Sequence, residues 1–321
     1  MRDSARATQD LKRLVEAFNL GVERGEFATE TVPCLCGSGD TTPVARYDHY
    51  GLWSPVVICR HCGLIFASPR LTAEAYNFFY SSDSYRVLYE GENYLEQAKE
   101  RFTGGYGLFI YEEVAPFLQL RRLSKIFELG CAGGWNLWHF YHQGYEVAGL
   151  DYSPSLVALG REQGLNLQVG SIPDIQGKYD VIILSHVVEH LPDVLTSVNQ
   201  IASHLNNNGI MYISLPDMDN FSMAELQNAH VYYFSCRTFI HYMHQCGLKL
   251  VKFGPSEVKH MFGIFEVTGS KPVKISLEGE YGVLMRKIRK AKMKYHLVNL
   301  LHWLGIKEVA LRVYHRVGGY K

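Results

Sequence analysis

Four cysteines occur as two close pairs in a short, loop-rich part of the chain. The segments CLCG and CRHC contain Cys34, Cys36, Cys59 and Cys62, with 22 residues between the pairs. Four thiolates tolerate close approach only around a cation, and Zn²⁺ takes four of them as a tetrahedron that leaves no position open for catalysis. The spacing therefore predicts a structural zinc site. Because the first pair is C-x-C and not C-x₂-C, four reduced cysteines without metal are the alternative.

A glycine-rich turn, IFELGCAGGW, is the second group of residues that could do chemistry. An expected strand leads directly into Gly130, Gly133 and Gly134, and glycine allows a backbone to approach a ligand closely. Asp151 follows the next expected strand, which suits a carboxylate that binds vicinal ribose hydroxyls. The register does not fit G-x-G-x-x-G, so NAD is disfavoured, and Glu128 favours a cationic ligand over a pyrophosphate. A tight turn without a ligand is the alternative.

Three histidines are candidates for a base. His186 and His190 follow the expected strand VIILS, and His230 lies in the segment NAHVYYFS. Because the ordinary pKa of histidine is about 6.5, such a side chain suits proton transfer at neutral pH. We expect His230 to be the catalytic base, with His190 second and a structural role for both as the alternative. HVVEH also fits an H-x-x-E-H metal pattern, but Pro192 leaves room for barely one helical turn, so we expect no metal there.

The elements that must position these residues alternate between strand and helix from Lys125 onward. The expected strands are KIFEL, YEVAGL, VIILS, IMYISL, LKLVKF and GIFEVTG, and the expected helices span 135–144, 153–164, 194–205 and 236–247. This alternation predicts an α/β fold with a doubly wound, mostly parallel sheet. Ligands of such sheets bind beyond the carboxyl ends of the strands.

The pattern divides the chain into five expected parts. They are an N-terminal helix (1–30), a zinc-ribbon module (31–70), a helical lid or linker (71–124), the sheet domain (125–270) and a basic amphipathic helical tail (271–321). The tail contains 12 Lys or Arg and three Glu. A basic amphipathic helix predicts peripheral contact with an anionic membrane or with an acidic partner; a helix packed on the domain is the alternative.

Composition excludes several classes of protein. With 47% hydrophobic residues, the chain is not disordered. The first 270 residues carry 20 basic and 29 acidic side chains, which argues against a nucleic-acid partner. Apolar runs of about eight residues are too short to cross a bilayer, and the charged start is not a signal peptide. Seven cysteines, an odd number, predict a cytoplasmic location.

Taken together, the motifs resemble those of the class I S-adenosylmethionine-dependent methyltransferases. FELGCAGG is similar to the first motif of that family, with Ala132 where glycine is common, LDYS to its second acidic motif, and YDVIILSHVVEHLPD to its fourth strand and following loop. GSIPDI resembles the adenine-side segment, with Ser171 where an acidic residue is common. The resemblance covers about 125–270 and implies a seven-stranded Rossmann-like sheet with S-adenosylmethionine as cofactor. The implied cofactor residues are Glu128 at the methionine amino group, Asp151 at the ribose, and Gly130, Cys131, Ala132, Gly134, Tyr152, Ser171, Ile172, Ser185 and His186.

The order of the parts resembles bacterial sugar methyltransferases that carry an N-terminal zinc module. The cysteine segment, CRHCGLIFASPRLT and FYSSDSYR support this, and His230 is similar to the histidine of an E-H-x-x-Y-F-S segment, with Ala229 in place of the acid. The resemblance implies methyl transfer to a small-molecule or lipid-linked saccharide, on oxygen in preference to carbon, at the inner face of the membrane if the tail docks there. An RNA methyltransferase and a non-catalytic, cofactor-binding scaffold are the alternatives.

Overall fold

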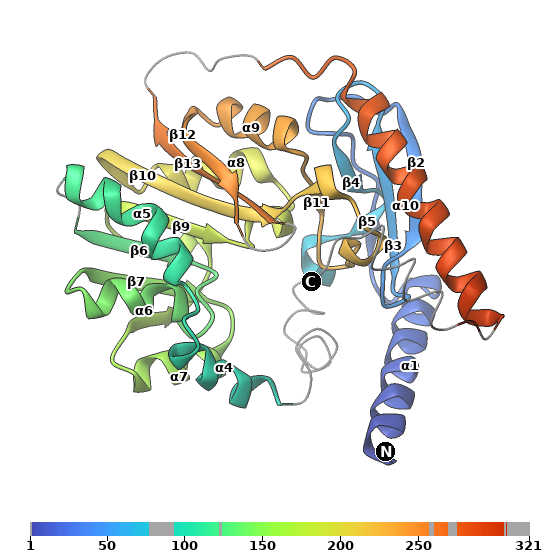
Figure 1. Cartoon of the computed structure of the whole chain (residues 1–321), viewed down its shortest axis with the longest axis horizontal. Coiled ribbons are helices and arrows are strands. Elements are labelled where there is room, and N and C mark those ends of the chain that lie inside the picture. Colours follow the sequence, from blue (N-terminus) through green and yellow to red (C-terminus); the bar gives the residue numbers. More distant parts are fainter. Residues whose placement is uncertain are drawn as a thin grey trace.

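A seven-stranded sheet dominates the computed structural model, which describes residues 2–76, 93–121, 124–256, 260–268, 275–304 and 306. The strand order is β12-β13-β10-β9-β6-β7-β8 (Figure 1). The strands are β6 (Lys125–Leu129), β7 (Glu146–Asp151), β8 (Asn166–Val169), β9 (Tyr179–Ser185), β10 (Leu205–Pro216), β12 (Leu248–Pro255) and β13 (His260–Val267). Strands β8, β7, β6, β9 and β10 pair in parallel, whereas β13 is antiparallel to both its neighbours. After β8 the chain crosses back to β9 beside β6, which makes β6 the switch point of the sheet.

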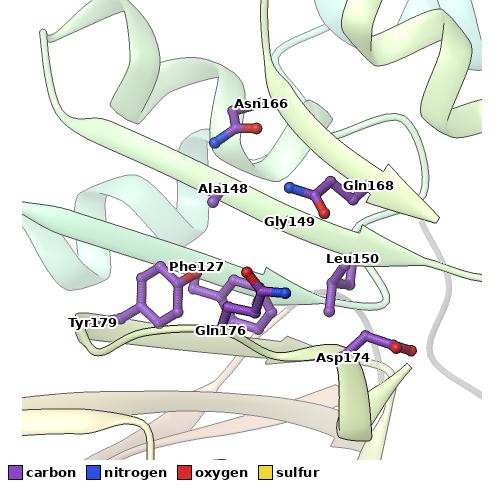
Figure 2. Close-up of a pocket in the computed structure, with 9 residues that line it drawn as sticks. All are labelled: Phe127, Ala148, Gly149, Leu150, Asn166, Gln168, Asp174, Gln176 and Tyr179. Atoms are coloured by element: carbon purple, nitrogen blue, oxygen red, sulfur yellow. The ribbon is translucent and has the colours of Figure 1, made fainter. Parts of the chain in front are cut away.

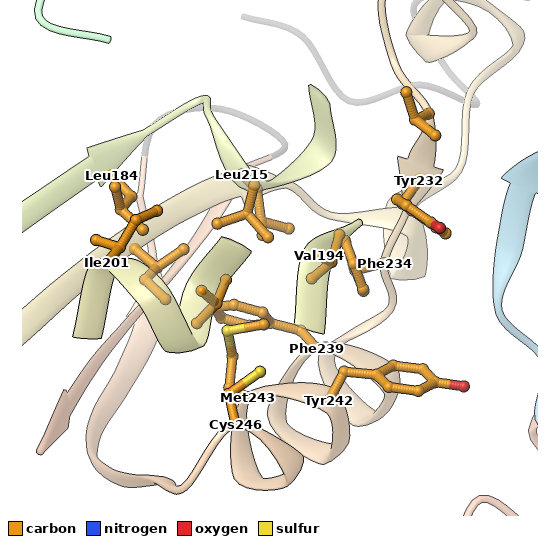
Figure 3. Close-up of a cluster of buried hydrophobic side chains, with 14 of the residues drawn as sticks. Leu184, Val194, Ile201, Leu215, Tyr232, Phe234, Phe239, Tyr242, Met243 and Cys246 are labelled. Atoms are coloured by element: carbon orange, nitrogen blue, oxygen red, sulfur yellow. The ribbon is translucent and has the colours of Figure 1, made fainter. Parts of the chain in front are cut away.

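Helices cover both faces of this sheet. They are α4 (Tyr94–Thr103), α5 (Leu108–Arg121), α6 (Trp135–His142), α7 (Pro154–Glu162), α8 (Val194–Ala202) and α9 (Cys236–Gln245). Along β9, Val181 and Ile183 are buried in the cluster that includes α4 to α7, because alternate side chains of a strand point to opposite faces. Ile182 and Leu184 are buried in the cluster with α8 and α9 (Figure 3). The prediction of a doubly wound α/β sheet is therefore confirmed.

A second, four-stranded sheet holds the cysteine pairs. Its order is β11-β4-β3-β2, with β2 (Thr41–Tyr47), β3 (Trp53–Cys59), β4 (Ile65–Ala67) and β11 (Tyr232–Tyr233). The short strands β1 (Thr29–Glu30) and β5 (Arg70–Leu71) pair with each other next to it. Strand β11 comes from the segment between β10 and α9, so the sheet domain contributes one strand to the cysteine module.

The two terminal helices pack on the cysteine module. Helix α1 (Arg2–Glu23) precedes it, and the Asn19 side chain donates to the Gly51 carbonyl at 2.9 Å. Helix α10 (Glu280–Trp303) lies along the four-stranded sheet (Figure 1), where Leu284 and Ile288 are buried against Val56 and other apolar residues. In the part of the chain that the structure describes, no helix is both long and apolar enough to span a bilayer.

The boundaries of several elements differ from the expected ones. The four helices of the sheet domain end earlier, at His142, Glu162, Ala202 and Gln245. NNNG was expected to follow a helix, but Leu205 already pairs with Tyr179, and an irregularity in β10 accommodates the asparagines. Four one-turn 3₁₀ helices, η1 (Ile172–Asp174), η2 (Val188–His190), η3 (Met218–Asn220) and η4 (Met223–Glu225), connect the described elements. The segment FYSSDSYR and residues 271–274 and 307–321 lie outside the described residues.

Candidate active site

The glycine turn between β6 and α6 requires glycine for steric reasons. Gly130 and Gly134 have φ of 71° and 83°, a region that L side chains rarely adopt. A β-carbon on Gly130 would lie 2.7 Å from Val187, and one on Gly134 would lie 2.7 Å from Leu165. Ala132 also has a positive φ, of 48°. The turn therefore brings backbone to the switch point of the sheet, where no side chain fits beside Val187.

Two predicted carboxylates lie at the ends of neighbouring strands. Glu128 is near the end of β6 and Asp151 ends β7, and these strands pair in parallel. The Asp151 carboxylate accepts the backbone N–H of Ala132 and of Ser153, both at 2.8 Å. Asp151 therefore fixes the glycine turn and presents a carboxylate beside it, and its contact with a ribose stays a prediction.

Glu128 is a fully buried carboxyl group with unsatisfied bonding capacity. The Asn136 side-chain amide donates to Oε1 at 2.7 Å, whereas Oε2 has no hydrogen-bond partner among the described residues. Burial, together with the nearby charge of Asp151, raises the pKa of Glu128 to about 8. A buried, unpaired carboxylate is costly. An ammonium group bound at Oε2 would supply both the missing hydrogen bond and a compensating charge.

The remaining predicted cofactor residues differ in how they face this edge of the sheet. Ser171 and Ile172 are half-buried at the start of η1, and Ser171 donates from its N–H and hydroxyl to Asp174 at 2.9 and 3.1 Å. Asp174 therefore places a carboxylate beside position 171. Tyr152 is 72% exposed. Cys131 is buried against Gly149, so its side chain faces the core and only its backbone can contact a cofactor.

A small cavity lies on one face of β6, β7 and β8 (Figure 2). Its volume is about 30 Å³, enough for water but far too small for a nucleoside. None of the predicted cofactor residues lines it. The candidate cofactor site is therefore the edge where the strands end, not this cavity.

Buried imidazole and carboxylate groups form a second cluster beside the strand ends. Glu189 and His190 belong to η2, which follows β9. At the end of β9, the predicted cofactor residue Ser185 accepts a hydrogen bond from the Ser214 hydroxyl at 3.2 Å. Potential ligand atoms of Glu189, His190 and His230 all lie within 4.8 Å of one another. His186 contacts Glu189 Oε1 through Nδ1 at 3.1 Å. The structure thus brings all three predicted histidines to one place and adds Glu189.

The burial of this cluster sets its charges. Burial lowers the pKa of His230 to about 3 and also lowers the pKa of His190. Although burial opposes it, the hydrogen bond and charge of His186 lower the pKa of Glu189 to about 2. The shift for His230 follows from its burial, because the side chain is only 5% exposed. The cluster combines an ionised Glu189 with neutral side chains of His190 and His230.

The cluster could also hold a divalent cation. His190 Nδ1 lies 2.8 Å from the Ala229 carbonyl, which places the proton on Nδ1 and the lone pair on Nε2. Glu189 Oε2 and His230 Nδ1 have no hydrogen-bond partner within the described chain. We expected no metal because Pro192 leaves room for barely one helical turn, but His230 on a distant segment adds a third potential ligand. Sequence spacing gives no signal for this contact.

The four cysteines converge as predicted for zinc. The Sγ atoms of Cys34 and Cys62 are 3.4 Å apart, those of Cys36 and Cys59 are 3.7 Å apart, and all four lie within 4.8 Å of one another. Four Zn–S bonds of about 2.3 Å imply sulfur–sulfur distances of about 3.8 Å in a tetrahedron. The donor set and its geometry therefore fit zinc. The C-x-C pair reaches this arrangement because Gly37 turns the chain with a φ of 83°.

Both candidate sites of the sheet domain lie within a segment that matches a known protein family. Residues 96–252, just under half of the chain, match the family model described as a methyltransferase domain. The chain is similar to the ubiquinone biosynthesis O-methyltransferases of Xanthomonas campestris (27% identical over 101 residues, 28% of this chain and 42% of the relative) and Rickettsia canadensis (30% over 114 residues, 33% and 48%). The chain spans less than half the length of these curated relatives.

Two solved structures are similar over a larger part of the chain. One is an S-adenosylmethionine-dependent methyltransferase from Clostridium acetobutylicum, with 12% identity, a TM-score of 0.43, and coverage of 60% of this chain and 99% of the other. The second is magnesium protoporphyrin IX methyltransferase from Synechocystis PCC 6803 with bound SAH, with 14% identity, a TM-score of 0.42, and coverage of 52% and 85%.

Proposed function

We propose that this chain, whose residues 96–252 match a methyltransferase domain, transfers the methyl group of S-adenosylmethionine. The observation that carries the proposal is the buried Glu128, with an unpartnered Oε2, next to Asp151 at the switch point of the sheet. Glu128 would accept the methionine ammonium group, and Asp151 would accept the ribose hydroxyls. Ser171 and Ile172 would line the adenine. Calorimetry with S-adenosylmethionine tests this assignment, and Glu128→Gln should weaken binding.

Methyl transfer to a hydroxyl also needs a group that accepts a proton. The acceptor oxygen forms a bond to the methyl carbon while the sulfur–carbon bond breaks in line with it, and the hydroxyl proton must leave. We assign this proton to His230, whose low pKa makes it neutral and able to accept. The adjacent Glu189 carboxylate would stabilise the resulting imidazolium. Glu189 thus replaces the acid that is missing at Ala229.

A cation-dependent version of the same reaction uses the same residues differently. Glu189, His190 and His230 would hold a divalent cation through the atoms described above. When bound, such a cation acidifies a hydroxyl that coordinates it. Loss of turnover after treatment with a chelator, restored by Mg²⁺ or Mn²⁺, favours this version. Turnover that chelators leave unchanged favours His230 as the base.

The proposed acceptor is a hydroxyl of a sugar or surface glycan, free or lipid-linked. The order of the cysteine module, the sheet domain and the E-H-like segment at His230 supports it. The ubiquinone biosynthesis O-methyltransferases are named for transfer to oxygen, which agrees with a site that contains a proton acceptor. Incubation with labelled cofactor and separate panels of glycans, catechols and RNA tests the acceptor. Labelled RNA would replace the glycan proposal, and cofactor binding without turnover on any panel would favour a scaffold.

Helix α10 supports a peripheral membrane contact of this enzyme. Between Glu280 and Lys294 it carries six Lys or Arg against one Glu. In its C-terminal half, Met293, Tyr295, Leu297 and Leu300 are exposed, and Leu304 is exposed just after the helix. Basic and apolar groups together favour an anionic membrane surface. Docking at the inner face of the membrane would bring the enzyme to a lipid-linked acceptor.

A further inference from the structure

Helix α9 of the sheet domain reaches the cysteine site through one side chain. The Tyr242 hydroxyl lies 3.3 Å from Cys62 Sγ and 3.9 Å from Cys34 Sγ. Its ring is fully buried, and Figure 3 shows the hydroxyl at the outer end of a side chain that points away from Leu184 and Ile201. Phe239 and Met243, on the same face of the helix, are buried in the core. Tyr242 is therefore anchored in the sheet domain at one end and contacts the thiolates at the other.

A thiolate that binds a metal carries no proton, so in the zinc-loaded site the hydroxyl of Tyr242 would be the donor in its contact with Cys62. A thiolate that binds zinc has lone pairs that accept hydrogen bonds, and such outer contacts orient metal ligands. A buried phenol that lost these acceptors would leave a polar group unpaired.

The segment that carries His230 is held between the same two parts. Strand β11 follows His230 and pairs with β4, which begins three residues after Cys62. Ala67, at the end of β4, also donates its N–H to the Val231 carbonyl at 2.9 Å. Toward the sheet domain, the Val231 N–H donates to the Glu189 carbonyl at 2.8 Å. Ser235 then caps α9. The cysteine site is thus linked to the His230 segment in two ways. Strand β4 pairs with β11, and Tyr242 of the following helix α9 contacts Cys62.

We infer that Tyr242 is a positioning residue that couples the cysteine site to the His230 segment. Its hydroxyl donates a hydrogen bond to the Cys62 thiolate, stabilises bound zinc, and holds α9 and residues 228–235 against β4. The effect on turnover rests on the proposed function, but the effects on zinc and on the backbone do not.

Tyr242→Phe tests the inference, because it removes the hydroxyl and keeps the ring. In the zinc-loaded protein, we expect competition with a chromogenic chelator to show zinc affinity weakened by about tenfold or more. Amide hydrogen exchange in residues 228–246 should become faster, while exchange in β6 and β7 stays unchanged. Tyr212→Phe is the matched control, because Tyr212 is equally buried but packs on Phe262 in the cluster on the other face of the sheet.

Equal zinc affinity and equal exchange in the two variants would overturn the inference. The wild-type protein provides a second test that needs no variant. Removal of zinc by a chelator should accelerate exchange in 228–246 more than in 125–151, and an unchanged or uniform pattern would also overturn it. If zinc affinity and exchange shift as expected while no methyl transfer occurs on any acceptor, the coupling holds and the proposed function fails.

Discussion

Glu189 and His230 lie beside each other although one follows β9 and the other precedes β11. Their potential ligand atoms are within 4.8 Å, and the hydrogen bond from Val231 to the Glu189 carbonyl joins the two segments. A carboxylate beside a buried imidazole can stabilise the protonated ring. This relationship supports our proposal that His230 accepts a proton despite its low pKa.

Replacement of His230 should therefore lower turnover without weakening cofactor binding. We expect His230→Gln to reduce kcat by about 10²–10⁴-fold, the usual contribution of a positioned acid or base, while calorimetry shows unchanged affinity for S-adenosylmethionine. Glu189→Gln should also reduce kcat. His142→Gln, on the exposed side of α6, is the control. Equal kcat for His230→Gln and the control would exclude His230 from the reaction.

The raised pKa of Glu128 predicts a pH-dependent cofactor affinity. Below its pKa of about 8 the free carboxyl is protonated, whereas the ammonium group of the cofactor favours the ionised form and lowers the pKa in the complex. Binding should thus release a proton at pH 7, and affinity should rise between pH 6 and 8. Calorimetry in buffers of different ionisation enthalpy measures this release.

Glu128→Gln is the matched variant for this prediction. The amide does not titrate in this range, so affinity should be weaker by about tenfold or more, as for a lost charge-assisted hydrogen bond, and its rise between pH 6 and 8 should disappear. An identical pH profile in the wild type and the variant would show that another group is responsible.

The cysteine site should bind one zinc per chain and depend on all four thiolates. Cys59→Ser removes a buried ligand, so we expect zinc loss and a large drop in melting temperature, because structural zinc contributes folding free energy. Cys236→Ser changes a cysteine outside the cluster and should keep both the metal and the stability. Elemental analysis and thermal unfolding measure these quantities. Full zinc content in Cys59→Ser would contradict the assignment.

Reversal of charge on α10 should abolish binding to anionic vesicles. Each Lys near an anionic surface contributes about 1 kcal/mol, so replacement of Lys290, Lys292 and Lys294 by Glu should remove most of the attraction. Lys287 stays unchanged, because it pairs with Asp219 at 2.7 Å. Co-sedimentation with vesicles of anionic and of neutral lipid is the measurement. Equal sedimentation of the variant and the wild type would contradict the membrane contact and indicate that α10 only packs on the cysteine module.

Features that follow from a local pattern of residues were predictable from the sequence. Hydrophobic periodicity indicated the parallel strands, and the residues around Gly130 and Asp151 predicted two carboxylates at neighbouring strand ends. The pairing of β11 with β4 was not predictable, because Tyr232 and Tyr233 form a two-residue strand with no periodic signal. The contacts of Glu189 with His230 and of Tyr242 with Cys62 were also missed, because each joins segments far apart in the sequence. The low pKa of His230 follows from burial, which its sequence context does not indicate.

A crystal structure of the protein with S-adenosylhomocysteine tests the central assignment most directly. We expect the amino group of the ligand within hydrogen-bond distance of Glu128 Oε2 and the ribose hydroxyls on Asp151, with the sulfur facing the cluster of Glu189, His190 and His230. A ligand bound away from both carboxylates, or a sulfur turned away from that cluster, would contradict it.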